Sequence, residues 1–478
     1  MKLPEKGLSP EEILRRLETY RSDDMPWREG RTWAYIYDPG REAEEVIHRA
    51  YTMYLTENAL DPTVFPSTLR LENEVIGIAA EHLGGDDQVV GNFTSGGTES
   101  ILLAVKAARD YARKTRPGIE RPEMVLPVTA HAAFQKAGHY LGVEPVLVPV
   151  DPVSFRADVE AIRRAITPRT ILLVGSAVSY AHGVVDPIPE IAALARERAI
   201  WLHVDACMGG FLLPYFRRLG AEFPDFDFRV DGVTSISMDF HKYAFAAKGA
   251  SSVLYRSREY RKCQMYACAN WPGYTVINAT VQSTKSAGPV AAAWAVLHFF
   301  GDEGYLEIAR RVKEATEKVV RGIEAIPGLR VLGRPDMNLV AFTSDEASVF
   351  HIVDEMRARS WYVQPQLAYP GSKENIHLSI NPTSVRWVED FLRDLRDAVE
   401  SAKKLPPGKL AALVREHLPA GGSFDENTFD ALAAAAGIEG EKLPSRMAEI
   451  NEVLNALSPA QREELLVEFL DRLYRPVR

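Results

Sequence analysis

The segment Thr94–Ser100 reads Thr-Ser-Gly-Gly-Thr-Glu-Ser and leads directly into a helical pattern. Paired glycines allow a tight turn with bare backbone N–H groups, and the N-terminus of a helix favours an anion. The same residues also describe an ordinary helix start, in which a Ser/Thr cap is followed by Glu. The segment has no Walker lysine and no G-x-G-x-x-G pattern. The turn alone therefore leaves both interpretations open.

A carboxylate and a lysine follow two apolar runs further along the chain. Asp205 comes directly after Ile200–Val204. There it could keep the ring nitrogen of a buried pyridine protonated, which makes the ring an electron sink, or it could simply cap the next turn. Lys242 follows Val233–Ser237, beside His241 and several aromatic residues. Partial desolvation there would lower the lysine pKa and favour the neutral amine that forms a Schiff base, although a lone lysine is far more often a surface charge.

Two histidines occupy comparable positions. His131 begins a helix after the run Met124–Pro127, and His182 lies in the loop that follows Thr170–Gly175. An imidazole can stack on a heteroaromatic ring or act as acid or base, but a histidine can also start a helix without any catalytic role. An anion turn, a carboxylate, an imidazole and a lysine at successive strand ends are hard to explain by structure alone. Together they indicate a catalytic site.

These residues need a scaffold that brings strand ends together. Between residues 71 and 255, short β-rich runs alternate with helical stretches, which predicts βαβ units and a mostly parallel sheet covered on both faces. In such α/β sheets, ligands bind at the carboxyl ends of the strands. The expected strands are Met124–Pro127, Pro145–Val150, Thr170–Gly175, Ile200–Val204, Val233–Ser237 and Ser251–Tyr255, and the expected helices between residues 71 and 200 are Glu72–Leu83, Glu99–Arg113, Ala132–Leu141, Val159–Ile166 and Ile188–Arg198.

Composition restricts the classes of function. The net charge of −9 disfavours a general affinity for nucleic acid or for an anionic membrane. No apolar run is long enough for a transmembrane helix, and the N-terminus lacks a secretory apolar core. The three cysteines, Cys207, Cys263 and Cys268, form neither a disulfide framework nor a zinc-site spacing. We therefore expect a cytoplasmic enzyme without a metal site.

Five motifs in unbroken order carry a resemblance to a known family. They are Thr-Ser-Gly-Gly-Thr-Glu-Ser, His-Ala-Ala-Phe, His-Gly-Val-Val-Asp-Pro, His-Val-Asp-Ala-Cys and His-Lys-Tyr. Together they resemble the group II pyridoxal-phosphate decarboxylases and, among these, the soluble bacterial type of sphingosine-1-phosphate lyase. The similarity runs from Trp27 to Ala402. It implies a type I, aspartate-aminotransferase-like fold that binds pyridoxal 5′-phosphate, and a homodimer with shared active sites.

The resemblance also implies roles for individual residues. Lys242 would form the Schiff base with the cofactor, Asp205 would pair with its ring nitrogen, and His131 would stack on its ring. The cofactor phosphate would be held by Gly97, Thr98 and His241, with Thr284 a weaker candidate. The residues expected near the reacting centre or the substrate are His182, Tyr37, Lys248, Asn58 and Asp61.

Several positions depart from the family pattern, and most of them fall on the substrate side. The family segment Asn-Pro-Leu-His-Pro reads Asn58-Ala59-Leu60-Asp61-Pro62 here, which puts a carboxylate where an imidazole would meet a substrate phosphate. A like charge beside a desolvated phosphate is unfavourable by roughly several kcal/mol. The sequence therefore predicts that the cofactor site is kept and that the phosphate-recognising half of the substrate pocket has changed.

We expect four parts in a chain of this length, because 478 residues exceed what one core usually supports. Residues 1–66 form an N-terminal helical segment that contacts the partner in a dimer, and residues 67–302 form the large cofactor-binding α/β domain. Residues 303–404 form a small α+β domain, and 405–478 form a helical extension. The expected helices of this extension are Lys409–Glu416, Glu426–Ala436, Pro444–Leu457 and Pro459–Leu473.

Three functions remain open at this point. The first is a carbon–carbon lyase that cleaves a β-hydroxy amine by a retro-aldol reaction to an aldehyde and a smaller amine. The second is an amino-acid decarboxylase on the same scaffold; the change at Asp61 favours either this reaction or a non-phosphorylated amine as the substrate. The third is a catalytically idle scaffold whose helical extension binds a partner. The intact set of cofactor residues argues against the third.

Overall fold

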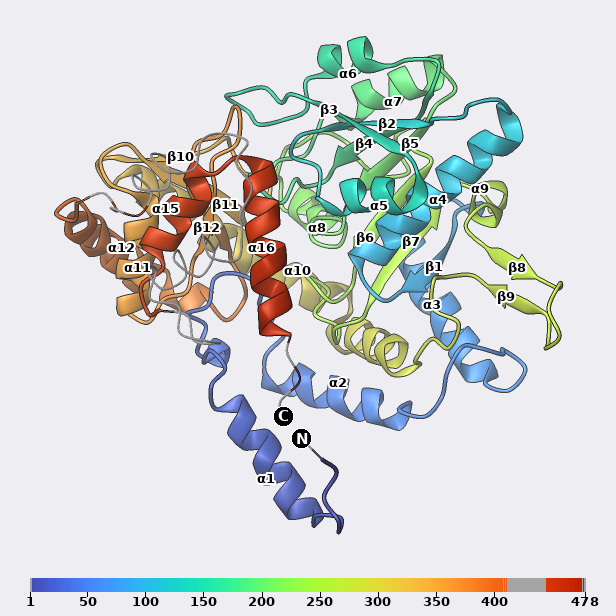
Figure 1. Ribbon diagram of the computed structural model, residues 1–478, viewed down its shortest axis with the longest axis horizontal. Helices are drawn as coiled ribbons and strands as arrows, with labels where there is room; N and C mark the ends of the chain where they lie inside the picture. The colour runs from blue at the N-terminus through green and yellow to red at the C-terminus, as the bar shows by residue number, and fades with distance from the viewer. Residues whose placement is uncertain (1, 407, 409, 411–443, 475, 477–478) are drawn as a thin grey trace.

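The computed structural model describes residues 2–406, 408, 410, 444–474 and 476. Its larger sheet has seven strands in the order β1-β7-β6-β5-β4-β2-β3 (Figure 1). The expected α/β fold with a mostly parallel sheet is confirmed: β3, β2, β4, β5 and β6 run parallel, whereas β7 is antiparallel to both of its neighbours. The strands are β1 (Val90–Thr94), β2 (Glu123–Pro127), β3 (Glu144–Val148), β4 (Thr170–Ser176), β5 (Trp201–Asp205), β6 (Ser235–Asp239) and β7 (Ser251–Tyr255).

Helices cover both faces of this sheet, as alternate residues of β4 show. Leu173 packs in the cluster that contains α6 and α7, whereas its neighbours Leu172 and Val174 pack with α4 and α5. Successive side chains of a strand point to opposite faces, so each face has its own helical layer. The helices of this region are α3 (Pro66–His82), α4 (Gly97–Thr115), α5 (Ala133–Leu141), α6 (Val159–Ala165), α7 (Ile188–Glu197), α8 (Leu213–Arg218) and α9 (Arg258–Lys262).

A second, antiparallel sheet has the order β10-β11-β13-β12. Before it the sequence predicts two helices, over Pro289–Phe300 and Tyr305–Ile326. The structure agrees: α10 consists of two helical stretches that meet at a kink at Gly301, whose φ of 57° is left-handed. The elements are α10 (Gly288–Glu324), β10 (Leu329–Val331), β11 (Leu339–Ser344), α11 (Val349–Ala358), β12 (Gln364–Gln366), β13 (Asn375–Ser379) and α12 (Val388–Ala402).

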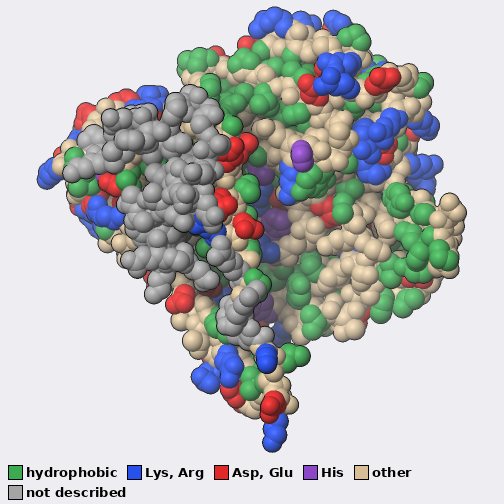
Figure 2. Space-filling model, in the orientation of Figure 1, with side chains coloured by type: hydrophobic (Ala, Val, Ile, Leu, Met, Phe, Trp, Pro, Cys, Tyr) green, Lys and Arg blue, Asp and Glu red, His purple; other side chains and the backbone are tan. Residues whose placement is uncertain are grey.

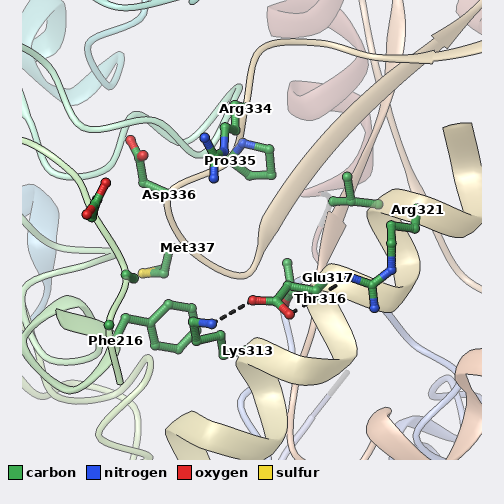
Figure 3. A pocket seen from close by; sticks show the side chains of 13 residues that line it. Phe216, Lys313, Thr316, Glu317, Arg321, Arg334, Pro335, Asp336 and Met337 are labelled. Carbon is green, nitrogen blue, oxygen red and sulfur yellow. Dashed lines mark hydrogen bonds and ion pairs between the residues drawn. The ribbon is translucent and has the colours of Figure 1, made fainter. Parts of the chain in front are cut away.

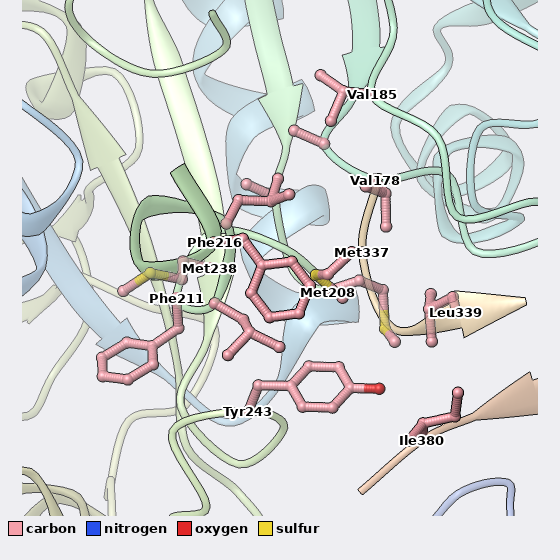
Figure 4. Close-up of a cluster of buried hydrophobic side chains, with 14 of the residues drawn as sticks. Val178, Val185, Met208, Phe211, Phe216, Met238, Tyr243, Met337, Leu339 and Ile380 are labelled. Atoms are coloured by element: carbon pink, nitrogen blue, oxygen red, sulfur yellow. The ribbon is translucent and has the colours of Figure 1, made fainter. Parts of the chain in front are cut away.

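One hydrophobic core joins the two sheets. Met208 and Phe211, which follow β5, pack in the same cluster as Leu339 of β11 and Ile380 after β13 (Figure 4). Met337 and Val178 also belong to this cluster. The two sheets are therefore packed against each other through apolar side chains, which fixes the walls of the space between them.

The ends of the chain carry further helices. Near the N-terminus lie α1 (Pro10–Arg21) and α2 (Arg41–Met53), and a hairpin of β8 (Tyr266–Cys268) and β9 (Val276–Asn278) projects from the body (Figure 1). At the other end are α15 (Ala448–Ala456) and α16 (Pro459–Leu473). The expected helices Lys409–Glu416 and Glu426–Ala436 lie almost wholly outside the described residues. Within the described part of the chain, no helix is long and apolar enough to cross a membrane.

Candidate active site

A polar cavity of about 350 Å³ lies at the carboxyl ends of the parallel strands. It opens into the groove between the two sheets, where histidine and basic side chains are visible at depth (Figure 2). The residues that line it come from the turns and strand ends after β1, β2, β4, β5 and β6. They are Ser95, Gly96, Gly97, Thr98, Glu99, Ile101, His131, Ser176, Val178, Tyr180, Asp205, Cys207, Met208, Asp239, His241 and Lys242.

The turn after β1 leads into α4, which begins at Gly97. The Glu99 side chain fixes the turn, because its Oε2 accepts hydrogen bonds from the N–H and the hydroxyl of Ser95 at 2.6 and 2.7 Å. A Cβ atom at Gly97 would lie 2.9 Å from Cys207 Sγ and 3.0 Å from both carboxylate oxygens of Asp239. Only glycine fits there without displacing its neighbours. The N-terminus of a 19-residue helix therefore opens directly into the cavity.

Asp205 ends β5 with its carboxylate at the cavity wall. Its Oδ1 accepts hydrogen bonds from the Cys207 N–H at 3.1 Å and from the Ser237 hydroxyl at 3.3 Å. The side chain is almost fully buried. A buried carboxylate held in this way favours a cationic partner in the cavity.

Lys242 and Asp239 form a buried ion pair, with 2.8 Å between Lys242 Nζ and Asp239 Oδ2. Burial acts to lower the lysine pKa, but the Asp239 carboxylate outweighs it and the pKa of Lys242 is raised. The expectation of a lowered pKa is therefore wrong for this structure, because it considered desolvation without the carboxylate three residues earlier. The other Asp239 oxygen, Oδ1, is buried and has no hydrogen-bond partner.

His241 and His131 lie on the rim. The imidazole of His241 is 3.5 Å from Asp239 Oδ2, and its Nδ1 accepts the N–H of Ala250 at 3.2 Å. Burial lowers the pKa of His241 to about 4, so the ring is neutral at physiological pH. His131 Nδ1 accepts the N–H of Ala133 at 3.1 Å, which orients this ring at the start of α5.

Lys248 and Tyr37 lie against each other next to this cavity. The Lys248 amine is 4.5 Å from the centroid of the Tyr37 ring and donates to the His241 carbonyl at 3.3 Å. Although part of its side chain meets solvent, protein atoms around the amine and the nearby Lys242 lower the pKa of Lys248 to about 8. Burial raises the pKa of Tyr37, so its hydroxyl stays protonated. A lysine with a pKa near neutrality can take up or release a proton.

His182 lies behind the cavity wall. It stacks on Phe155, with ring centroids 4.0 Å apart, and its Nε2 is 3.1 Å from the Ser372 hydroxyl. Burial lowers the pKa of His182 to about 4. Val178 and Tyr180 line the cavity from this loop, and the Tyr180 hydroxyl donates to Gln364 Oε1 at 2.6 Å.

The three remaining candidates gather at a different place. Asn58 forms a β-bridge with Ser286, and the N–H of Ala59 donates to the Lys285 carbonyl at 2.8 Å. Asp61 and Thr284 are exposed on this surface. None of the three lines the cavity that holds Lys242. The Asp61 carboxylate accepts hydrogen bonds from the backbone and hydroxyl of Thr63, which lowers its pKa.

Several lining residues had no assigned role from the sequence, among them Asp239, Cys207, Tyr180 and Ser176. Asp239 is three residues before Lys242 at the end of a strand, and this spacing is the signal that could have identified it. Nothing in the sequence distinguishes Tyr180 from its neighbours, because its position depends on contacts with β12 and β13, more than 180 residues later.

The cavity fits pyridoxal phosphate. The exposed N-terminus of α4 suits a phosphate, the Asp205 carboxylate suits a protonated ring nitrogen, and Lys242 suits the aldehyde. Gly97 has no side chain that would crowd the cavity beside Asp239, and the buried Asp239 Oδ1 has no hydrogen-bond partner. The lining at this place is therefore uncrowded and polar. Among the described residues, no three His, Cys, Asp or Glu side chains come together as a metal site would require.

A second cavity of about 320 Å³ lies between α8, α10 and residues 334–337 (Figure 3). Two ion pairs involve its lining residues: Lys313 with Glu317 at 2.6 Å, and Asp336 with Arg156 at 2.8 Å. It is lined by none of the residues at the strand ends of the larger sheet. The cavity around Lys242 is therefore the candidate active site.

The family comparison agrees with this site. Residues 47–345 match the pyridoxal-dependent decarboxylase conserved domain, which is more than half of the chain. The chain belongs to the pyridoxal-dependent decarboxylase family. It is a lyase that depends on pyridoxal 5′-phosphate.

Individual relatives point to one branch of that family. The sphingosine-1-phosphate lyase of Arabidopsis thaliana is 44% identical over 412 residues, which covers 84% of this chain and 74% of the relative. The structure of a sphingosine-1-phosphate lyase from Burkholderia pseudomallei is 37% identical, has a TM-score of 0.81, and is matched over 84% of this chain and 93% of that one. A probable L-aspartate decarboxylase of Pyrococcus furiosus is 35% identical over 77% of this chain and 96% of the relative.

A second family model matches the C-terminal extension. Residues 407–472 are similar to the C-terminal putative HTH domain of pyridoxal-dependent enzymes. Of this segment the structure describes Gly408, Leu410 and residues 444–472.

Proposed function

We propose that this lyase cleaves a carbon–carbon bond of a β-hydroxy amine and releases an aldehyde and a smaller amine, as the similarity to sphingosine-1-phosphate lyases suggests. The observation that carries the proposal is the position of Lys248. Its amine, with a pKa near 8, lies beside Tyr37 and the His241 carbonyl, next to the cavity that holds Lys242. A retro-aldol cleavage needs such a group, because the substrate hydroxyl must lose its proton as the carbon–carbon bond breaks.

The residues around the cavity are assigned to the cofactor as follows. Bound there, pyridoxal phosphate supplies an electron sink for the bond that breaks. Gly97, Thr98 and His241 hold its phosphate, and Thr284 is a weaker candidate. Asp205 would keep the ring nitrogen protonated, His131 would cover the ring, and Lys242 would hold the cofactor through its aldehyde group.

The proton transfers are assigned to the second lysine and the tyrosine beside it. In its neutral form, Lys248 accepts the substrate hydroxyl proton, and as an ammonium it returns a proton to the carbon left on the amine product. Tyr37 keeps its own proton and orients the Lys248 amine through its ring. His182 does not contact the substrate in this proposal. Its hydrogen bond with Ser372 holds the loop that carries Tyr180, and so fixes the cavity wall.

We further infer a homodimer in which each subunit completes the other's site. Asn58, Asp61 and Thr284 lie together outside the cavity of their own chain. They are surrounded by exposed apolar side chains, namely Met53, Leu55, Leu60, Val64 and Val281. Apolar patches of this kind mark protein interfaces. In the dimer these residues are proposed to face the substrate in the partner's cavity, in a cytoplasmic setting that suits the three free cysteines.

The test is product analysis with the cofactor-loaded enzyme. Sphingosine-1-phosphate, its unphosphorylated amine and a panel of amino acids including L-aspartate are incubated separately, and aldehyde and carbon dioxide are both measured. Aldehyde without carbon dioxide supports the lyase. Carbon dioxide from an amino acid, with no aldehyde from either sphingoid amine, would establish the decarboxylase instead, the reaction that the Pyrococcus relative is named for. Activity on the free amine alone would assign Asp61 a hydroxyl rather than a phosphate as its partner.

A further inference from the structure

The C-terminal helix α15 packs on α11 of the smaller sheet's layer, and side chains of both helices fix the contact. The buried carboxylate of Asp354 accepts the N–H groups of Met447 and Ala448 at 2.9 and 3.0 Å, where α15 begins. One turn into α15, Glu452 accepts the Ser348 hydroxyl at 3.0 Å. These contacts satisfy backbone donors that a helix N-terminus otherwise leaves open. The register of α15 on this surface is therefore well defined.

From this position α15 reaches the segment that follows β12. The side-chain oxygen Oδ1 of Asn455 accepts the backbone N–H of Ala368 at 2.7 Å. Directly afterwards the chain makes a tight turn, closed by two hydrogen bonds between the backbones of Tyr369 and Ser372. No strand pairs with Ala368 itself, so Asn455 supplies the hydrogen bond that fixes this end of the turn.

The other end of the turn contacts the wall of the active site. Ser372 Oγ lies 3.1 Å from His182 Nε2, and Gln366 Nε2 donates to the Ala181 carbonyl at 3.0 Å. Gln364 accepts the hydroxyl of Tyr180, which lines the cavity with Lys242. Three hydrogen bonds thus join residues 364–372 to residues 180–182. A displacement of the turn is transmitted to the Tyr180 side of the cavity.

We propose that the C-terminal extension is part of the catalytic unit: α15 positions the turn 367–372 through Asn455, and the turn in turn positions Tyr180 and His182 at the cavity. Asn455 is a positioning residue, since it touches neither the cofactor site nor the substrate. Loss of its hydrogen bond leaves Lys242, Asp205 and the anion turn unchanged. It loosens the turn 367–372 and thereby weakens the binding of the substrate.

The experiment compares three full-length, cofactor-loaded variants. Asn455→Ala removes the acceptor, and Asn455→Asp keeps an oxygen at the same place. Asn451→Ala is the matched control, one turn earlier on the same helix, where the side chain makes no hydrogen bond with a described residue. Hydrogen exchange of residues 364–372 is measured for each by mass spectrometry. This readout does not depend on which reaction the enzyme catalyses.

We expect faster exchange of residues 364–372 in Asn455→Ala, by roughly two- to tenfold, as the loss of one half-buried hydrogen bond implies. Exchange returns to that of the parent chain in Asn455→Asp and is unchanged in Asn451→Ala. The visible absorbance of the bound cofactor stays the same in all three. Equal exchange in the parent and Asn455→Ala chains, or an equal increase in Asn451→Ala, overturns the proposal.

A second measurement rests on the proposed function and uses sphingosine-1-phosphate as substrate. Asn455→Ala and Ser372→Ala, which cut the same connection at its two ends, are both expected to raise KM by roughly two- to tenfold while kcat changes less than twofold. A fall in kcat with KM constant contradicts a positioning role. If sphingosine-1-phosphate is not turned over at all, the proposed substrate fails while the exchange experiment still decides the role of α15.

Discussion

At the scale of single residues, the arrangement around Asp239 explains why the anion turn requires glycine at position 97. Asp239 holds the Lys242 ammonium at 2.8 Å and lies beside His241, and Gly97 leaves room for its carboxylate. A side chain at Gly97 would push against a buried carboxylate and a buried thiol, neither of which has free space. At Gly96 the nearest atom to an added Cβ is His241 Cε1, at 3.7 Å, an ordinary contact.

This difference predicts opposite outcomes for two alanine substitutions in neighbouring positions. Gly97→Ala should weaken cofactor binding by about five- to 150-fold, because overpacking a closed site costs roughly 1–3 kcal/mol. Gly96→Ala, the control, should bind the cofactor nearly as the parent does. The dissociation constants follow from titrating the cofactor-free protein while its absorbance is recorded. Similar weakening in both variants would mean that the turn, and not the space at Gly97, limits binding.

The lowered pKa of Lys248 predicts a pH dependence. A base accepts a proton only in its neutral form, so kcat/KM should rise with pH through about 8, where Lys248 loses its charge. Lys248→Gln should lower kcat by roughly 10²–10⁴-fold and remove this rise, with the cofactor absorbance unchanged. A rise near pH 8 that persists in Lys248→Gln would assign it to another group.

At the scale of elements, a buried ion pair joins the parts that position the anion turn. Lys285 Nζ is 2.5 Å from Glu72 Oε2 on α3 and 3.2 Å from the Phe93 carbonyl of β1. The other oxygen of Glu72 accepts the Phe93 N–H at 3.0 Å. One pair thus connects α3, β1 and the segment that carries Thr284.

Removal of one partner leaves the other as an uncompensated buried charge. Lys285→Met should therefore lower the free energy of unfolding by about 3–5 kcal/mol, as measured by denaturant titration. The double variant Glu72→Gln with Lys285→Met should recover part of that loss. Arg70→Met is the control, since it removes an exposed partner of Glu74 on the same helix and should cost less than about 1 kcal/mol. If Lys285→Met and Arg70→Met lowered the free energy of unfolding equally, the buried pair would have no special role.

The elements were predictable where local pattern decides the structure. Ser251–Tyr255 was expected as a strand and is β7, and the turn Thr94–Ser100 leads into α4 as the glycines indicated. The strand β1 was not expected, because Val-Gly-Asn-Phe-Thr has little apolar pattern of its own and is a strand through its pairing with β7. The spatial separation of Asn58 from Lys242 could not be predicted either, since it depends on how distant loops pack.

At the scale of the whole molecule, large apolar side chains remain exposed in the segment from β9 to residue 281 and on α1. Ile277 of β9 is 64% exposed and Val281 is 67% exposed, close to the loop that contains Asn58. The helix α1 has no buried residue and exposes Ile13, Leu14, Leu17 and Tyr20. Such surfaces are unfavourable in water and require a partner.

The proposed homodimer predicts that the chain elutes as a dimer in light-scattering chromatography. Val281→Asp should shift it toward the monomer and reduce activity with it, because a buried unpaired charge opposes association. Val153→Asp is the control, since Val153 is 78% exposed in the loop after β3, away from Asn58 and Thr284. A Val281→Asp chain that remains dimeric and fully active would show that this surface is not the interface.

The antiparallel pairing of β1 with β7 has a consequence for biosynthesis. Val90–Thr94 leaves the ribosome roughly 160 residues before Ser251–Tyr255, the one strand with which it pairs in the described part of the chain. Pairing across so long a separation is slow, and it cannot begin before the later strand is made. The turn that follows β1 consequently gains its fixed position only after more than half of the polypeptide has been translated. A nascent chain therefore has no assembled vitamin-binding site, and the cofactor is captured late in maturation.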